Sequence, residues 1–174
     1  MVVTTFNFNH RLERSLRTLN TTLKSIQTAE GFRYIGWMSA LVIAKSILVH
    51  SIAELFFPPK DFILRIDIWW FIVIVGPILE TLLFTTFGCW VLGLFGVPPS
   101  LIIFITAAVF GWNHLGSDDQ WVRALSTGIT GCIFSWMYLR RIKEDRPWEG
   151  FKEVTLVHMI NNGLAYIGMT FFAP

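Results

Sequence analysis

Charged residues are scarce in this sequence, and so are cysteines. Asp, Glu, Lys and Arg make up 15% of the 174 residues, whereas about a quarter is usual in a soluble domain. The two cysteines, Cys89 and Cys132, both fall inside apolar stretches and form neither a disulfide framework nor a metal-binding spacing. The formal net charge is only +2, so we expect no nucleic-acid partner. With 53% hydrophobic residues, the composition indicates that the partner is a lipid bilayer.

Runs of about ten alternating polar and apolar residues are also missing, which argues against membrane-spanning strands. Five apolar stretches are instead long enough to cross roughly 30 Å of hydrocarbon as helices. The sequence therefore predicts an all-α fold, a polytopic bundle of about five transmembrane helices. The second stretch contains Gly76-Pro77, where we expect a kink or a break. The stretches lie near 35–56, 68–95, 98–115, 121–139 and 153–172.

The first 33 residues lack the short apolar core and cleavage site of a secretory signal peptide, so we expect the first span to remain in the mature protein. Leucines and an isoleucine recur at helical spacing over 11–28, with basic residues between them. This pattern predicts an amphipathic helix in the headgroup layer, with a helix packed on the bundle as the alternative. We therefore divide the chain into a cytoplasmic arm, 1–33, and a transmembrane domain, 34–174.

Lysines and arginines gather in the N-terminal arm and in a predicted solvated loop over 140–153. Because cytoplasmic loops carry an excess of these residues, we expect a cytoplasmic N-terminus and an external C-terminus, in the plasma (inner) membrane of a prokaryote. Lys45 lies within the first span, and we expect it to extend toward the headgroups. Ten basic residues lie on the cytoplasmic side, namely Arg11, Arg14, Arg17, Lys24, Arg33, Arg140, Arg141, Lys143, Arg146 and Lys152, and three on the other, Lys60, Arg65 and Arg123.

Small residues recur every fourth position in the fourth span, at Ala124, Gly128 and Cys132. Such a stripe lets two helix backbones approach closely in a membrane. We interpret it as a packing surface and assign it no chemistry.

Four polar side chains stand out inside the apolar spans: Glu80, His114, His158 and Asn162. An ionised Glu near the bilayer centre costs roughly 2.5–3.5 kcal/mol on insertion scales, so it normally faces the bundle interior and marks a function. His158 and Asn162 share one helix face, as do Phe110 and His114. A buried Glu beside histidines suits general-base catalysis on water, and Asn162 suits a donor to a developing oxyanion. A polar network that only fixes helix register is the structural alternative.

Two other functions remain open from the residues alone. Two histidines and one glutamate are a common zinc set, although the chain has no His-Glu-x-x-His on one helix. Glu80 and the histidines could also form the proton path of a small transporter or channel component. The inverted repeat that many transporters carry is not visible, which disfavours transport.

Three motifs in order resemble those of the CPBP intramembrane proteases, the group that includes CAAX prenyl endopeptidases and bacteriocin-processing or immunity proteins. That family carries Glu-Glu-x-x-x-Arg, usually preceded by Pro-x-x, then Phe-x-x-x-His, then His-x-x-x-Asn. The resemblance covers about residues 66–172. The matching segments are Pro77-Ile-Leu-Glu80-Thr81-Leu-Leu-Phe84-Thr85, Phe110-Gly-Trp-Asn-His114 and His158-Met-Ile-Asn-Asn162.

The resemblance implies hydrolysis of a peptide or membrane-protein substrate inside the membrane, with no cofactor and no metal. Glu80 would activate water, His114 would help to orient or activate it, and His158 and Asn162 would stabilise the oxyanion. Thr81 and Thr85 stand where the family has its second Glu and its Arg, and we expect them only to support the site. This departure leaves a second hypothesis, an inactive relative that binds or scaffolds other membrane proteins.

Overall fold

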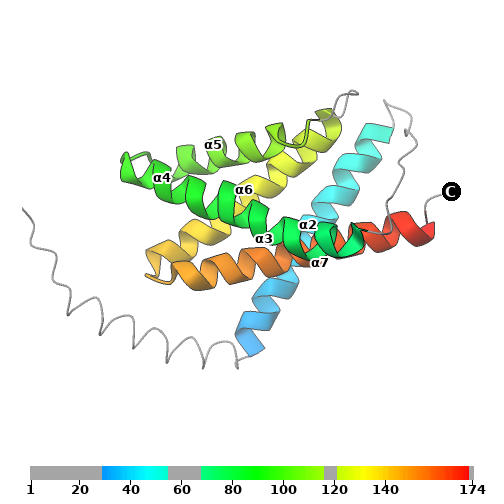
Figure 1. Ribbon diagram of the computed structural model, residues 1–174, viewed down its shortest axis with the longest axis horizontal. Coiled ribbons are helices and arrows are strands. Elements are labelled where there is room, and N and C mark those ends of the chain that lie inside the picture. The colour runs from blue at the N-terminus through cyan, green and yellow to red at the C-terminus, as the bar shows by residue number, and fades with distance from the viewer. Residues whose placement is uncertain (1–28, 55–67, 116–120, 173–174) are drawn as a thin grey trace, which may run out of the picture.

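The structure, a computed structural model, describes residues 29–54, 68–115 and 121–172, and these residues form helices joined by short turns, without a β-strand. The predicted all-α bundle is therefore confirmed. The predicted amphipathic helix over 11–28 lies outside the described residues, as does most of the 1–33 arm. Five helical rods make up the described part (Figure 1): α2 (Ala29–Glu54), a composite rod ending in α4 (Gly88–Leu94), α5 (Pro99–Trp112), α6 (Trp121–Lys143) and α7 (Pro147–Phe172).

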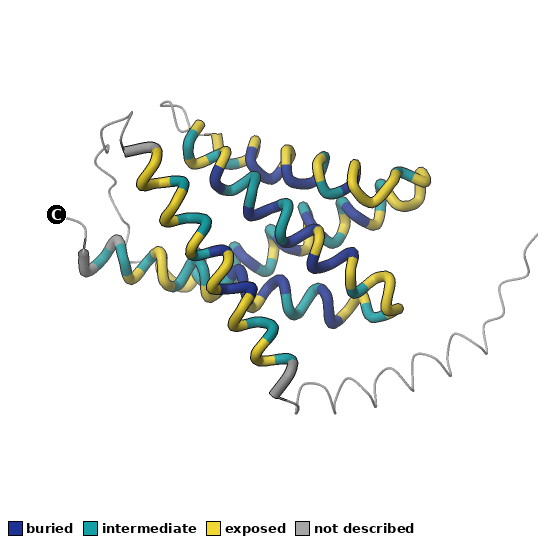
Figure 2. The backbone as a smooth tube through the Cα atoms, turned by 180° about the vertical axis from the view of Figure 1, so that it is seen from behind, coloured by how far each residue is buried: buried dark blue, intermediate teal, exposed yellow. Residues whose placement is uncertain are grey.

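Two segments of the described chain are long and apolar enough to cross a bilayer by length and composition, Gly31–Ile52 and Phe71–Leu94. The helix Pro99–Trp112 is apolar but shorter. Large apolar side chains are exposed on every rod, among them Trp37, Phe104 and Trp112, which are 76%, 67% and 75% exposed. Exposed apolar surface of this extent is unusual in a soluble monomer and is what a lipid-facing bundle requires. Figure 2 shows the buried residues gathered where the helices face one another.

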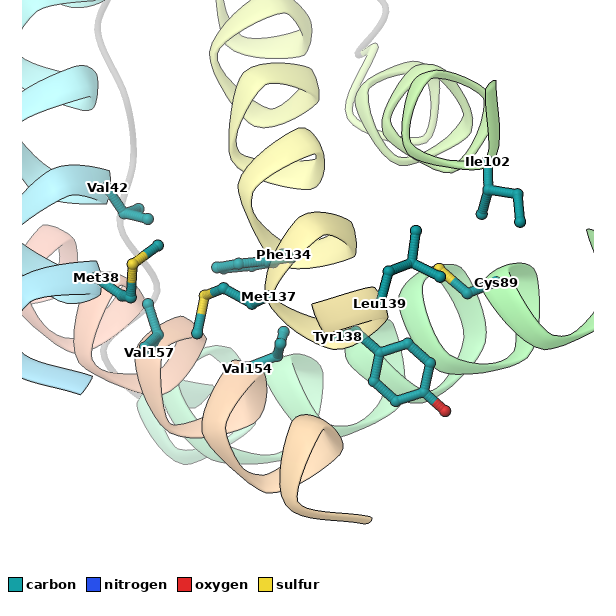
Figure 3. Packing of buried hydrophobic residues seen from close by; sticks show 10 residues of the cluster. All are labelled: Met38, Val42, Cys89, Ile102, Phe134, Met137, Tyr138, Leu139, Val154 and Val157. Carbon is teal, nitrogen blue, oxygen red and sulfur yellow. The ribbon is translucent and has the colours of Figure 1, made fainter. Parts of the chain in front are cut away.

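The hydrophobic core lies around α6, which contacts α2, α5 and α7. In Figure 3, Met38 and Val42 of α2 lie toward Val157 of α7, and Met137 of α6 lies between this group and Val154 of α7. On the other side of α6, Leu139 lies beside Cys89 of α4, and Ile102 of α5 completes this half of the cluster. A single cluster thus joins all five rods. Its members are Met38, Val42, Cys89, Ile102, Phe134, Met137, Tyr138, Leu139, Val154 and Val157.

Glycines set the distance between α5 and α6. A Cβ atom added to Gly111 would lie 2.6 Å from the carbonyl oxygen of Ala124 and 3.1 Å from the Cα of Gly128. One added to Gly131 would lie 3.0 Å from the Cα of Ala107. Ala124 and Gly128 of the predicted stripe therefore face α5, but the third close contact comes from Gly131, one residue before Cys132.

The composite rod runs through Gly76-Pro77 without the break that the sequence suggested. It consists of η2 (Phe71–Val75), α3 (Gly76–Glu80), η3 (Thr81–Phe87) and α4, where η2 and η3 are π-helical. Pro77 has no N–H to donate to the carbonyl four residues back, and the N–H of Gly76 bonds instead to Phe71, five residues back. The wider turns accommodate the proline and leave Glu80 at the junction of α3 and η3. π-Helical turns inside α-helices are frequent at functional sites.

The 140–153 segment is mostly helical and is not the solvated loop that we predicted. Helix α6 continues to Lys143 and α7 begins at Pro147, and the turn between them is made by Asp145 in the left-handed conformation, with φ of 60°. Arg141 donates to both carboxylate oxygens of Glu153, at 2.8 and 2.5 Å. This ion pair holds the ends of the two helices together beyond the apolar part of the spans.

Lys45 does not extend toward the headgroups. Its ammonium donates to the carbonyl oxygen of Ser126 at 2.9 Å, to the Ser126 hydroxyl at 3.1 Å and to the Thr130 hydroxyl at 2.6 Å. All three acceptors lie on α6, so these hydrogen bonds join α2 to α6. Three hydrogen bonds account for the three protons of an ammonium group.

Candidate active site

Glu80 is the point at which three of the four predicted residues meet. Its Oε2 atom lies 3.5 Å from Nε2 of His158 and 3.8 Å from Nε2 of His114. The glutamate is the last residue of α3, His114 follows the end of α5, and His158 lies within α7. The Glu80 side chain is 27% exposed, against 16% for His114 and 5% for His158. The carboxylate is thus partly accessible and faces two imidazoles that are more deeply buried.

The orientation of His114 is set by its own helix. Its Nδ1 atom lies 2.8 Å from the carbonyl oxygen of Phe110, one turn earlier. A carbonyl oxygen only accepts hydrogen bonds, so the Nδ1 atom must carry a proton, and Nε2 of the neutral ring presents a lone pair toward Glu80. The 3.8 Å separation is too long for a direct hydrogen bond, but one water molecule can bond both atoms.

His158 is enclosed by aromatic rings and a hydroxyl. The ring of Phe134 lies 5.0 Å away between centroids, and the ring of Phe110 lies 5.8 Å away with its plane at 87° to the imidazole. On the side away from Glu80, Nδ1 of His158 lies 3.4 Å from the Thr81 hydroxyl. Phe110 also packs edge-on against His114 at 4.8 Å, so one phenylalanine contacts both imidazoles.

Asn162 lies one turn beyond His158 on the same face of α7, as the spacing predicted. Its Nδ2 donates to the carbonyl oxygen of Ile72 at 3.0 Å, in the π-helical segment that precedes α3. No hydrogen bond joins Asn162 to Glu80, His114 or His158, all of which are described. Because an amide nitrogen has two protons, the contact with Ile72 orients Asn162 and leaves one N–H for another acceptor.

Residues 63–164 match the sequence model of a known family, the type II CAAX prenyl endopeptidase Rce1-like proteins. The match covers more than half of the chain and includes Glu80, His114, His158 and Asn162. The protein belongs to this Rce1-like family. No curated protein and no solved structure matched the chain.

Membership confirms the resemblance to the CPBP group that the three motifs suggested. It makes the protein a member of a family of CAAX-type membrane proteases, so hydrolase activity on peptides at the bilayer follows at the level of the family. The chain departs from the family motif at Thr81 and Thr85. Both threonines are buried, at 1% and 5% exposure, and the Thr81 hydroxyl lies 3.4 Å from Nδ1 of His158.

Two features near the site were not foreseen from the sequence. Phe134 comes from the fourth span, which carries no motif, and nothing in its sequence distinguishes it from other core phenylalanines. Arg123 is near enough to Glu80 to attract its carboxylate electrostatically, although we assigned it only to the count of basic residues. The side-chain positions that the structure describes include no group of three or more His, Cys, Asp or Glu residues that could hold a metal ion.

Proposed function

We propose that the protein is a glutamate-dependent intramembrane endopeptidase in which Glu80 is the general base. The observation that carries this proposal is the approach of two imidazole nitrogens to one carboxylate oxygen, at 3.5 and 3.8 Å, from separate helices. A structural polar network would be expected to pair its members directly. Here the His114 nitrogen, with its lone pair, stands at a distance from Glu80 that suits a shared water molecule.

The proposed reaction begins with a water molecule held between Glu80 and His114. The water oxygen attacks the substrate carbonyl carbon, and Glu80 accepts a proton from the water at the same time. His158 and the second N–H of Asn162 donate hydrogen bonds to the oxyanion that forms. The carbon–nitrogen bond then breaks, Glu80 returns the proton to the leaving amine, and the products are a new carboxylate and a new amino terminus.

The depth of Glu80 limits the substrate. It lies nine residues after Phe71 in the apolar stretch that runs to Leu94, which is at most about 14 Å along the rod, because the rise of 1.5 Å per residue is that of an α-helix and Phe71–Val75 is π-helical. A scissile bond that reaches this depth must belong to a peptide held in the membrane, by an attached lipid or by its own apolar segment. We therefore propose lipid-modified peptides or membrane-protein tails as substrates, with no nucleic acid involved.

Cleavage by the purified protein in liposomes tests the proposal. One probe is a farnesylated peptide with a C-terminal CAAX sequence, and the other is a membrane-protein tail that spans the same bilayer. Mass spectrometry should show a single cut in at least one probe, with one oxygen from heavy-oxygen water in the new carboxylate. If neither probe is cut by protein that retains its helical fold, the non-catalytic binder is the better assignment.

Activity is expected to persist without a metal ion. The reason is that a carboxylate base with oxyanion donors completes the chemistry without a Lewis acid. The measurement is cleavage after dialysis against EDTA, together with elemental analysis of the purified protein. One tightly bound zinc per chain, with activity lost on chelation and restored by zinc, would replace the glutamate mechanism with a metal mechanism.

The two termini are expected on opposite sides of the membrane. The excess of basic residues near the N-terminus and the α6–α7 turn, ten in all, supports a cytoplasmic location for both parts. Single cysteines introduced as Thr5→Cys and Pro174→Cys, in a background without Cys89 and Cys132, should react with an impermeant maleimide from the cytoplasmic and external sides, respectively. Reaction of both from one side would show that the number of membrane crossings is even.

A further inference from the structure

We infer that the two histidines of the site are held in opposite tautomers, and that the Thr81 hydroxyl is the positioning group that sets the tautomer of His158. His114 carries its proton on Nδ1, and His158 carries its proton on Nε2. The catalytic consequence rests on the proposed function, whereas the tautomers themselves follow from contacts that do not depend on it.

The first half of the inference comes from the Phe110 carbonyl, 2.8 Å from Nδ1 of His114. This acceptor fixes a proton on Nδ1 and leaves Nε2 of the neutral ring as an acceptor facing Glu80. His114 is thus prepared to receive a hydrogen bond or a proton from water on the Glu80 side.

The second half depends on the hydroxyl proton of Thr81. Threonines in helices often donate to the carbonyl one turn back, and four others in the described chain do so: Thr106 to Ile102, Thr127 to Arg123, Thr130 to Ser126 and Thr170 to Tyr166. The Thr81 hydroxyl makes no such bond within the described residues. Its one hydrogen-bond contact there is Nδ1 of His158, at 3.4 Å.

Burial favours one direction for that bond. Thr81 is 1% exposed, so a hydroxyl proton without an acceptor would remain unpaired in the bundle interior, which is unfavourable. If Nδ1 of His158 carried the proton, Thr81 would have to accept it and its own proton would have no acceptor. The satisfied arrangement has Thr81 donating to Nδ1.

The other nitrogen of the same ring, Nε2, supports this assignment. Once Nδ1 accepts from Thr81, the proton of the neutral imidazole lies on Nε2, which faces Oε2 of Glu80 at 3.5 Å. An N–H on Nε2 would be attracted by the negative charge of this carboxylate, so the Glu80 contact agrees with a proton at that nitrogen. The two contacts of His158 therefore select the same tautomer.

The consequence is a division of roles around Glu80: His114 accepts and His158 donates. An ionised glutamate at position 81, as in the family motif, could only accept and would hold the proton of His158 on Nδ1. Thr81 therefore does more than fill the place of a second glutamate, because a hydroxyl can donate to the His158 ring and an ionised carboxylate cannot.

Nitrogen NMR of the full-length protein in lipid nanodiscs tests the tautomers directly. The sample carries ¹⁵N-histidine, and the resonances of His114 and His158 are assigned from the spectra of His114→Gln and His158→Gln. The wild type should show a protonated Nδ1 in His114 and a protonated Nε2 in His158. In Thr81→Val, the proton of His158 should no longer prefer Nε2 over Nδ1. In Thr81→Ser, that preference should remain.

Thr155→Val is the matched control, because it removes a buried hydroxyl from α7 that has no hydrogen-bond partner in the described structure. It should leave both histidine spectra unchanged. A wild-type His158 that is protonated on Nδ1 or on both nitrogens would overturn the inference, and so would an unchanged spectrum in Thr81→Val.

Cleavage assays separate this inference from the proposed function. Thr81→Val should lower kcat roughly tenfold with little change in KM, as expected for the loss of one hydrogen bond, and Thr81→Ser should restore most of the rate. Opposite tautomers in a protein that cleaves neither probe would refute the proposed function and leave the tautomer assignment standing. Normal cleavage by Thr81→Val would refute the positioning role and leave the proposed function standing.

Discussion

Glu80→Gln is expected to lower kcat by a factor of at least 10² and up to about 10⁴, the range that general-base catalysis contributes. Glutamine has nearly the same shape as glutamate, so it can occupy the same place between His114 and His158. Its amide cannot take a proton from water at neutral pH, and no other acidic residue lies in the middle of the same rod. The measurement is kcat and KM for cleavage of the farnesylated probe in liposomes, with KM expected to change little.

Glu144→Gln is a suitable control for this experiment. Glu144 pairs with Arg140 and Arg141 near the α6–α7 turn, outside the apolar spans, so the same chemical change there should leave kcat unchanged. His114→Ala should also lose nearly all activity, whereas Thr81→Ala removes only the hydroxyl that contacts His158 and should lower kcat no more than roughly tenfold. Full function in Glu80→Gln, by cleavage or by a processing or resistance phenotype in cells, would assign the protein to binding or scaffolding.

The apolar pattern predicted the number and type of helices, and it misplaced those ends that lie outside the apolar stretches. Hydropathy predicted α7 from 153, but the helix begins at Pro147. Its first two turns contain Glu149, which pairs with Arg146, and Glu153, which pairs with Arg141. These turns are stabilised by ion pairs with Arg141 near the end of α6 and with Arg146 in the turn before α7. A search for apolar stretches therefore mistakes them for a loop.

The approach of Glu80, His114 and His158 was predictable from motif order and helical spacing. The contacts that orient these side chains were not predictable, nor was the bond between Asn162 and the Ile72 carbonyl. Spacing places Phe110 and His114 on one face, yet it cannot show that the Phe110 carbonyl binds the imidazole. The Thr81–His158 contact depends on how the composite rod is rotated, and the two π-helical segments change that rotation. Lys45 was misjudged for a similar reason, since its acceptors are three hydrogen-bonding atoms of α6 that no local pattern connects with α2.

The close contact of α5 and α6 also determines where His114 lies, because Gly111 precedes it by three residues. On the side of α5 where Gly111 lies, the nearest atoms of α6 are backbone atoms of Ala124 and Gly128. Backbone atoms cannot rotate away as a side chain can, so even one methyl group must push the two helices apart. Any such shift moves His114 relative to Glu80, which is held by a different rod.

Gly111→Ala is therefore expected to destabilise the fold by about 1–3 kcal/mol, the usual range for overpacking, and to lower kcat by about 10²-fold, as a 1 Å displacement of a catalytic group can. Its Cβ would lie 2.6 Å from the Ala124 oxygen, whereas the Cβ of Gly128→Ala, at the same interface, would meet nothing closer than 3.6 Å. Gly128→Ala should thus stay near wild type in both measurements. The stability is measured by reversible unfolding in mixed micelles and the rate by cleavage of the farnesylated probe. Equal stability and equal rate for the two alanine variants would show that α5 and α6 can separate without disturbing His114, and the site would then depend on the other helices alone.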